Sequence, residues 1–298
     1  MFHNNFFQMK KMTMLSGNKF KKKYSHWFDL TLLLGLILFV SSCSRNVPNK
    51  TDEEKEGDMV AKNNIKSISE FVVEIQNDVR SKEQIRHKKD LDNSGKIIKT
   101  TNYTPDGAIE NFILSDYDDH GHLITKRSMK SDSVLIFREE RTYDRNDNRN
   151  AYYFYLPYGT CESREFVFYD NRHRILKTWY WNSGLKAITD YSYEEMLLTE
   201  MKKFSPRGEL LGKTTYKYDK KNHLLEDTQL SPDNSILRKT VFVYNMDNKK
   251  NKEISYFGNQ IQSILTYEYD RKGLLISEKK YDSNEKIQDE FRFQYEYY

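Results

Sequence analysis

The chain has 298 residues and a formal net charge of +4, from 48 basic and 44 acidic side chains. Its first 42 residues hold six lysines and one aspartate, so the remaining chain has 42 basic and 43 acidic side chains. A nucleic-acid-binding domain should be markedly basic, and this balance therefore excludes nucleic acid as an expected partner.

Residues 1–42 have the pattern of a signal peptide. Six lysines precede an apolar run at residues 30–40, and two serines then lead to Cys43. The apolar run is shorter than the roughly 20 residues that a membrane-spanning helix needs. We therefore expect a secretory leader that is removed from the mature protein.

The segment Val40-Ser41-Ser42-Cys43 resembles the lipobox of bacterial lipoproteins. This resemblance implies that a diacylglyceryl group joins the Cys43 thiol, that the leader is cleaved, and that the new amine is acylated. Several acyl chains hold a protein on a bilayer, whereas one chain does so only weakly. Membrane lipid is thus an expected partner through Cys43, and a free cysteine after an ordinary signal peptide is the alternative.

Residues 43–64 are predicted to form a lipidated tether. They contain Pro48 and a charged run at residues 52–58, with little apolar surface to bury. Some surface-exposed lipoproteins carry a similar acidic stretch, although a solvated spacer explains it equally. The expected location is the bacterial outer membrane, with the lipid-anchored domain either surface-exposed or facing the periplasm. Cys161 is the other cysteine of the chain, so no disulfide is expected within the folded region.

Residues 65–298 repeat with a period near 25 residues. Each unit has an anchor, usually a tyrosine followed by an acidic or amide residue, and the anchors are Leu91, Tyr117, Tyr143, Tyr169, Tyr193, Tyr218, Tyr244, Tyr269 and Tyr295. Successive anchors are 24 to 26 residues apart. A turn sequence such as Asp92-Asn93-Ser94-Gly95 follows the anchor, and an apolar residue often ends it.

A second turn, such as Thr104-Pro105-Asp106-Gly107, divides each unit near its middle. Two turns in each unit leave about eight residues for each of two strands, which is a normal strand length. Aromatic and polar residues alternate at residues 289–297, as in a half-buried strand. The first unit is predicted to form strands at residues 66–76 and 82–91, although its apolar positions also fit a helix.

The predicted fold is all-β. Tandem β-hairpin repeats of about 25 residues should form one long, curled antiparallel meander sheet, because short turns join neighbouring strands. Roughly 17 strands, each adding about 20 to 25° of twist, cannot stay flat. The sequence leaves open whether the sheet becomes a spiral or a partly closed shell.

The motifs at residues 117–123 and 269–275, in which Tyr-Asp is followed by Gly-x-Leu, resemble the YD repeats of Rhs-type proteins. The resemblance covers about residues 66–298 and implies a scaffold of curled β-sheet. In the largest members of that family the sheet forms a shell around a toxin. This chain is much shorter and shows no toxin-like domain, so we expect the scaffold without the toxin.

No catalytic or metal site is assigned from the sequence. His120-Gly121-His122 is the tightest group of histidines, but it lies in a repeat turn, where turn polarity explains it. Phosphate-binding glycine loops and the GxSxG and HExxH motifs are missing from the sequence. We therefore expect a non-enzymatic protein without a cofactor.

One aromatic cluster breaks the repeat pattern and supplies the ligand-binding candidates Tyr153, Tyr155, Trp179 and Trp181. The two tryptophans are two residues apart, so they share one face of a strand. With one strand between them, the two aromatic segments should lie about 9 to 10 Å apart. Rings at this spacing suit a sugar or a peptide, and a locally well-packed core is the alternative interpretation.

The expected function is that of a lipid-anchored envelope protein, a non-enzymatic binding or interaction module with a glycan or protein ligand. A structural or immunity-type partner of another protein is the alternative, based on the Rhs resemblance alone. A polysaccharide-acting enzyme comes third, because it needs two carboxylates that converge on one cleft.

Overall fold

The computed structural model describes residues 62–76 and 79–298. The predicted signal peptide at 1–42, Cys43 and nearly all of the tether lie outside these residues. The elements of the described residues are β-strands, which confirms the all-β class. No helix in this part of the chain is long and apolar enough to cross a membrane.

Nineteen strands follow one another along the described residues. They are β1 (Ile65–Gln76), β2 (Val79–Arg80), β3 (Gln84–Leu91), β4 (Ile97–Tyr103), β5 (Ile109–Tyr117), β6 (Leu123–Lys130), β7 (Leu135–Tyr143), β8 (Arg149–Tyr155), β9 (Cys161–Tyr169), β10 (Ile175–Trp181), β11 (Leu185–Glu194), β12 (Leu197–Phe204), β13 (Leu210–Tyr218), β14 (Leu224–Leu230), β15 (Ile236–Tyr244), β16 (Lys250–Phe257), β17 (Gln260–Tyr269), β18 (Leu275–Tyr281) and β19 (Ile287–Tyr297). The strands expected at 66–76 and 82–91 are confirmed as β1 and β3, with the two-residue β2 between them.

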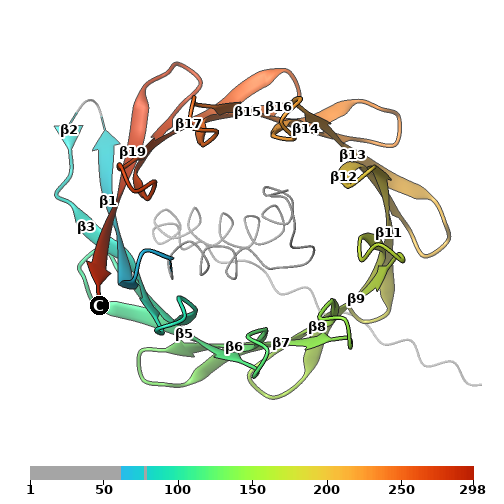
Figure 1. The fold of residues 1–298 in the computed structure, drawn as a ribbon, viewed down its shortest axis with the longest axis horizontal. Helices are drawn as coiled ribbons and strands as arrows, with labels where there is room; N and C mark the ends of the chain where they lie inside the picture. The colour runs from blue at the N-terminus through green and yellow to red at the C-terminus, as the bar shows by residue number, and fades with distance from the viewer. Residues whose placement is uncertain (1–61, 77–78) are drawn as a thin grey trace, which may run out of the picture. The chain divides into compact units, whose positions relative to one another are not determined.

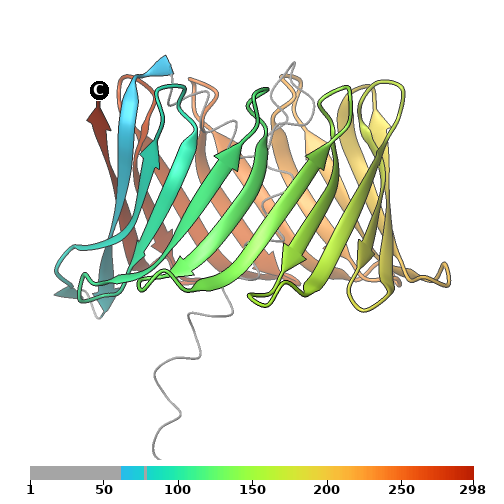
Figure 2. The ribbon, with the colours of Figure 1, turned by 90° about the horizontal axis from the view of Figure 1, so that it is seen from below.

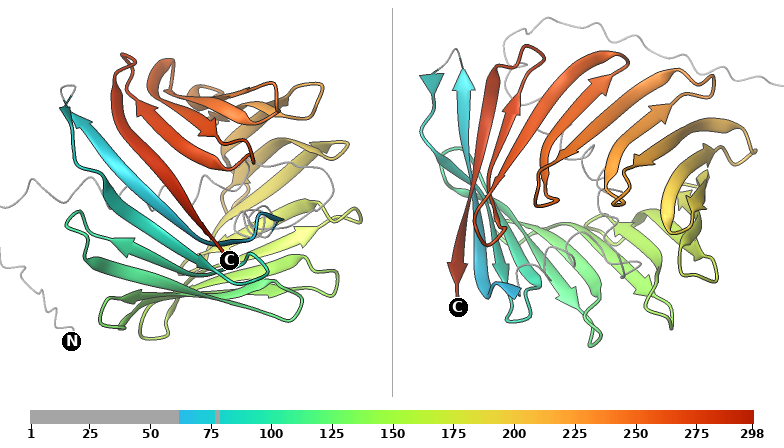
Figure 3. Two further views of the ribbon diagram at one scale, coloured as in Figure 1. Left: turned by 60° about the vertical axis from the view of Figure 1, so that its left-hand side comes forward. Right: turned by 45° about the horizontal axis from the view of Figure 1, so that its top comes forward.

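The antiparallel all-β sheet is confirmed, and it closes into a barrel, which neither a spiral nor a partly closed shell describes (Figure 1). From β3 to β19 each strand pairs with its neighbours in the chain, and β1 pairs with both β3 and β19. β2 pairs only with the end of β1, so 18 strands form the wall, and they are tilted as Figure 2 shows. Figure 3 shows β1 lying between β19 and β3. Closure has a physical cause: it pairs the backbone groups of two edges that an open sheet leaves unpaired.

Each anchor lies at or within two residues of the end of a strand, at one rim of the barrel, which we call the anchor rim. The β9–β10 turn is representative: Asp170 Oδ1 accepts hydrogen bonds from the backbone N–H groups of Arg172 and Arg174 at 2.8 and 3.0 Å. The fourth residue of this turn, His173, has a φ of 60°, and its equivalent Gly121 has a φ of 89°. This left-handed conformation explains why glycine or asparagine often follows an anchor by four residues.

The anchor tyrosines bridge neighbouring strands at the same rim. Six anchor hydroxyl groups donate to the backbone carbonyl 20 residues earlier, in the pairs Tyr117–Ile97, Tyr143–Leu123, Tyr169–Arg149, Tyr218–Leu198, Tyr244–Leu224 and Tyr295–Leu275. The Tyr269 hydroxyl donates to the Lys250 carbonyl, 19 residues earlier. At the junction of β1 and β19, Tyr298 makes the corresponding bond to the Leu91 carbonyl at 2.7 Å. Most units therefore have one lateral bond at the rim, and Tyr298 adds a bond that spans β1 to the end of β3.

The two faces of the wall differ in how deeply their polar side chains are buried. Tyr216 pairs with Asp227, and Tyr267 with Glu278, on one face. Burial raises the pKa of Tyr216, that of Asp227 to about 6 and that of Glu278 to about 7. Side chains on the concave side of a closed sheet converge and cover one another, and we therefore assign this more buried face to the inside of the barrel.

The outer face carries exposed ion pairs, some within the strands and some, such as Lys217–Glu226, next to the anchor rim. They are Arg127–Asp116 at 3.0 Å, Lys177–Asp190 at 3.1 Å, Lys202–Glu200 at 2.6 Å, Lys217–Glu226 at 2.8 Å and Lys279–Glu268 at 2.7 Å. The Lys217 side chain is 68% exposed. These pairs make the outer face the more charged and exposed of the two faces.

Candidate ligand-binding surface

The sequence candidates Tyr153, Tyr155, Trp179 and Trp181 lie on one face of the wall. Tyr153 on β8 pairs with Arg164 on β9, which in turn pairs with Trp181 on β10. Directly paired residues point to the same side of a sheet, and alternate residues of a strand do so too. The register thus puts all four candidates on the outer face, with β9 between the two groups.

β9 adds two rings that the sequence analysis did not single out, Phe166 and Phe168. The Phe168 and Trp179 rings are 4.9 Å apart, and the Tyr153 and Phe166 rings meet edge to face at 6.2 Å. The Tyr153 and Tyr155 rings are 6.3 Å apart. We call these six residues, Tyr153, Tyr155, Phe166, Phe168, Trp179 and Trp181, the aromatic patch. Phe166 and Phe168 are two residues apart on β9, and this spacing could have predicted that they share the face of the paired aromatic residues.

Two arginines border the aromatic patch. The Arg164 guanidinium lies 5.1 Å from the centre of the Trp181 ring, and that of Arg138 lies 4.7 Å from the Tyr155 ring. Both distances are typical of cation–π contacts. These contacts hold the rings in place and leave the charged groups at the edge of the patch.

Exposure separates the two tryptophans. Trp179 is 37% exposed and Phe168 is 40% exposed, so both present ring surface to solvent. The indole nitrogen of Trp181 is buried and has no hydrogen-bond partner among the described residues. Trp181 therefore supports the patch, whereas Trp179 and Phe168 form its accessible part.

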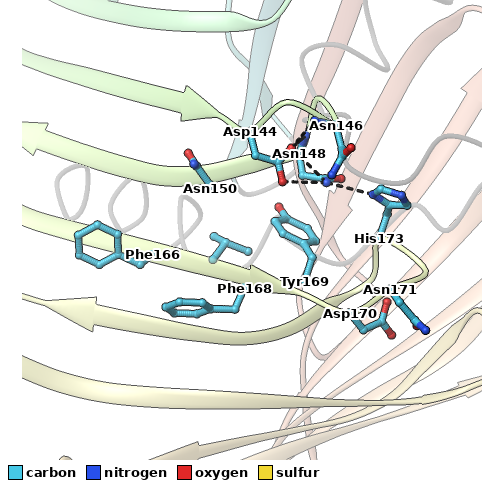
Figure 4. A pocket seen from close by; sticks show the side chains of 11 residues that line it. Asp144, Asn146, Asn148, Asn150, Phe166, Phe168, Tyr169, Asp170, Asn171 and His173 are labelled. Atoms are coloured by element: carbon cyan, nitrogen blue, oxygen red, sulfur yellow. Dashed lines mark hydrogen bonds between the residues drawn. The ribbon is translucent and has the colours of Figure 1, made fainter.

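A pocket with a volume of about 700 Å³ continues from the patch toward the anchor rim (Figure 4). It is lined by Asp144, Asn146, Asn148, Asn150, Phe166, Val167, Phe168, Tyr169, Asp170, Asn171 and His173. Phe166 and Phe168 belong to both the patch and the pocket. The pocket therefore joins exposed aromatic rings to the polar side chains of two adjacent turns.

The polar side of the pocket is held by a chain of hydrogen bonds. The Asn148 amide nitrogen lies 3.1 Å from Asp144 Oδ2 and 3.1 Å from His173 Nδ1, as the dashed lines in Figure 4 show. Burial acts to raise the pKa of Asp144, but backbone and side-chain hydrogen bonds from Asn148 outweigh it and lower that pKa. The carboxylate therefore stays ionised near neutral pH and fixes the amide beside it.

Comparisons with known proteins give no family for the chain. No family model matches it, and no curated protein matches it. Among solved structures, the chain is similar to a porin-like protein from Bacteroides uniformis, with 11% identity, a TM-score of 0.44, and coverage of 78% of this chain and 96% of the other. A porin-like protein from Bacteroides vulgatus is 12% identical, with a TM-score of 0.30 and coverage of 76% and 97%.

A third similar structure is TcdB2-TccC3-TEV, with 14% identity and a TM-score of 0.33. The match covers 74% of this chain but only 14% of the other chain's length. Likenesses of this degree carry no conclusion about ligand or activity.

Proposed function

We propose that this protein is a lipid-anchored, non-enzymatic binding module of the bacterial outer membrane, and that its barrel binds a glycan. Acyl chains on Cys43 hold the mature chain on the membrane, and residues 43–64 connect that anchor to the barrel. The barrel itself stands in water. The exposed ion pairs around the outer face support this arrangement, because a lipid-facing wall would have to bury them.

The observation that carries the glycan assignment is the continuity of the aromatic patch with the polar pocket. Sugar rings present C–H groups that pack on flat aromatic faces and hydroxyl groups that pair with amides and carboxylates. Phe168 and Trp179 offer the ring surface, and Asn146, Asn150 and Asn171 line the pocket beside them. Binding sites commonly combine an apolar lining with a few placed polar groups in this way.

A glycan array with the full-length protein in detergent tests the assignment, followed by titration of the best ligand against two variants. Trp179→Ala removes an exposed ring of the patch and should weaken binding at least tenfold. Tyr180→Ala is the matched control, since Tyr180 is the next residue, is 40% exposed, and lies on the other face. Both variants should keep their stability within about 0.5 kcal/mol.

A blank array contradicts the glycan assignment, and so does an equal loss of binding in the two variants. A loss of several kcal/mol in the stability of Trp179→Ala would instead make the patch part of the core.

Anchoring is tested by Cys43→Ser. The variant should lose lipid labelling and leave the membrane fraction, or accumulate as an uncleaved precursor, because no thiol remains for the lipid. Cys161→Ser is the control and should stay membrane-bound, since Cys161 is an exposed residue at the start of β9. If Cys43→Ser partitions into detergent as the parent protein does, the lipid anchor is not what holds the protein there.

A further inference from the structure

Two histidines and an aspartate meet at the anchor rim. His120 and His122 belong to the turn between β5 and β6, and Asp147 belongs to the turn between β7 and β8. His120 Nδ1 lies 3.4 Å from Asp147 Oδ1, and His122 Nε2 lies 3.7 Å from the same oxygen. All three donor atoms lie within 4.8 Å of one another.

These separations suit one tetrahedral metal ion. Zinc binds imidazole nitrogen and carboxylate oxygen at about 2.0 to 2.2 Å, so adjacent ligand atoms of a tetrahedral site lie roughly 3.3 to 3.5 Å apart. The two measured distances to Asp147 Oδ1 lie within a few tenths of an ångström of that range. The His120 side chain is 71% exposed and is free of packing that would stop a small adjustment.

The His122 ring is already oriented for a metal. Asp118 Oδ1 accepts the backbone N–H of His122 at 2.8 Å, and Asp118 Oδ2 lies 3.0 Å from His122 Nδ1. The ring also stacks on Tyr143 at 4.3 Å. When Nδ1 carries the proton, the lone pair of Nε2 faces a carboxylate oxygen of Asp147, an arrangement that a cation between them stabilises. A carboxylate behind a ligating histidine is the usual second layer of a metal site.

The equivalent turn at His223 has the same oriented histidine without the other two ligands. His223 is held by Asp219 at 2.8 Å and stacks on Tyr244 at 4.6 Å, as His122 does with its own neighbours. The positions that correspond to His120 and Asp147 are occupied there by Lys221 and Asn248, and Lys221 Nζ donates to Asn248 Oδ1 at 3.0 Å. The oriented histidine is thus a feature of the turn, and its combination with two more metal ligands belongs to the β5–β8 rim.

We propose that His120, His122 and Asp147 bind one zinc ion, or a similar first-row divalent cation, at the anchor rim. The three side chains fill three tetrahedral positions, and the fourth remains open to water or to a donor atom from a ligand. His120 and Asp147 are exposed, so the ion is accessible from solvent. From the sequence alone, His120 and His122 are explained by turn polarity, because the third ligand lies one repeat later, on a turn whose position only the fold reveals.

The test uses the full-length protein in detergent, made without a histidine tag, in a Cys161→Ser background and treated with chelator. Titration with Zn²⁺ should give one site, and Co²⁺ should give the visible absorption of a tetrahedral complex. His120→Ala and Asp147→Asn should each weaken Zn²⁺ binding at least tenfold and remove the cobalt spectrum. His223→Ala is the matched control and should leave both readouts unchanged.

A gain-of-function variant should create a second zinc site at the equivalent turn. Lys221→His combined with Asn248→Asp recreates the three ligands around His223 and should raise the stoichiometry from one to two. The proposal is overturned if the parent protein binds no more Zn²⁺ than the His120→Ala variant. It is also overturned if His223→Ala weakens binding as much as Asp147→Asn does.

Discussion

At the scale of single residues, the anchor tyrosines show why the repeat keeps a hydroxyl group at each anchor. The Tyr169 hydroxyl donates to the Arg149 carbonyl at 2.7 Å. Tyr169→Phe removes that donor and should lower the free energy of unfolding by about 1 kcal/mol, as for a typical intramolecular hydrogen bond. Urea unfolding measures the loss. Tyr180→Phe is the control, since Tyr180 is 40% exposed, and equal stability of the two variants would show that the anchor hydroxyl contributes nothing.

A second residue-scale prediction concerns the acidic inner face. Burial, with repulsion from Glu70, raises the pKa of Glu278 to about 7. An unfolded glutamate titrates near pH 4.3. Between these values the folded protein binds more protons than the unfolded chain, so stability falls as the pH rises from about 4 to 7. Burial raises the pKa of Asp227 to about 6, and the sign of its contribution is the same.

Glu278→Gln removes the buried charge and should therefore raise the melting temperature at pH 8. At pH 4.5 the folded protein already holds this carboxyl protonated, and the substitution should have little effect there. Thermal unfolding at both pH values measures the difference. Glu110→Gln alters an exposed glutamate of β5 and serves as the control. A melting temperature that does not depend on pH in the parent protein would contradict the prediction.

At the scale of elements, the anchor turns depend on an acceptor oxygen and not on its charge. Asp219 Oδ1 accepts from the backbone N–H groups of Lys221 and His223, at 2.7 and 2.9 Å. Asn245 Oδ1 does the same in the next unit, at 3.0 and 2.9 Å. Asp219→Asn should therefore keep most of the stability, whereas Asp219→Ala should lose about 1 to 2 kcal/mol. Chemical unfolding compares the variants, and equal losses would show that the charge is what matters.

The strands and turns were predictable because each unit repeats its own local signals. The anchor indicates where a strand ends, and the alternation of aromatic and polar residues indicates which side chains share a face of the sheet. Trp179 and Trp181 do lie on one face, as their spacing predicts. Phe166 and Phe168 were missed because the strand between the two aromatic segments was treated as a spacer. Asp147 was missed because neighbouring turns lie side by side only once the strands are paired.

At the scale of the whole molecule, closure was not predictable from the repeat. The period predicts that each strand pairs with the next one along the chain. It does not predict whether the first and the last strand pair with each other. The partner of β1 is β19, and residue pairs such as Ser69 and Gln294 are more than 200 positions apart. Tyr298, which bonds to Leu91 across this junction, lies outside the regular anchor spacing.

An engineered disulfide tests the closure. Ser69→Cys and Gln294→Cys are direct partners in the register, so their Cα atoms lie at a distance that a disulfide spans. In a Cys161→Ser background the pair should form an internal crosslink, seen as faster migration on a gel without reductant. Ser69→Cys with Thr215→Cys on β13 is the control and should not crosslink. A sheet that stays open leaves both pairs reduced.

The pairing of β1 with β19 also bears on how the chain is made. β1 is the first strand of the wall to be synthesised, and one of its edges has no partner until β19, the last strand, is complete. Any shorter product, whether cut by a protease or ended early by the ribosome, keeps two long edges that can pair with other chains. Closure therefore separates chains that reach β19 from shorter ones, because only a chain that includes β19 can pair both edges of the sheet.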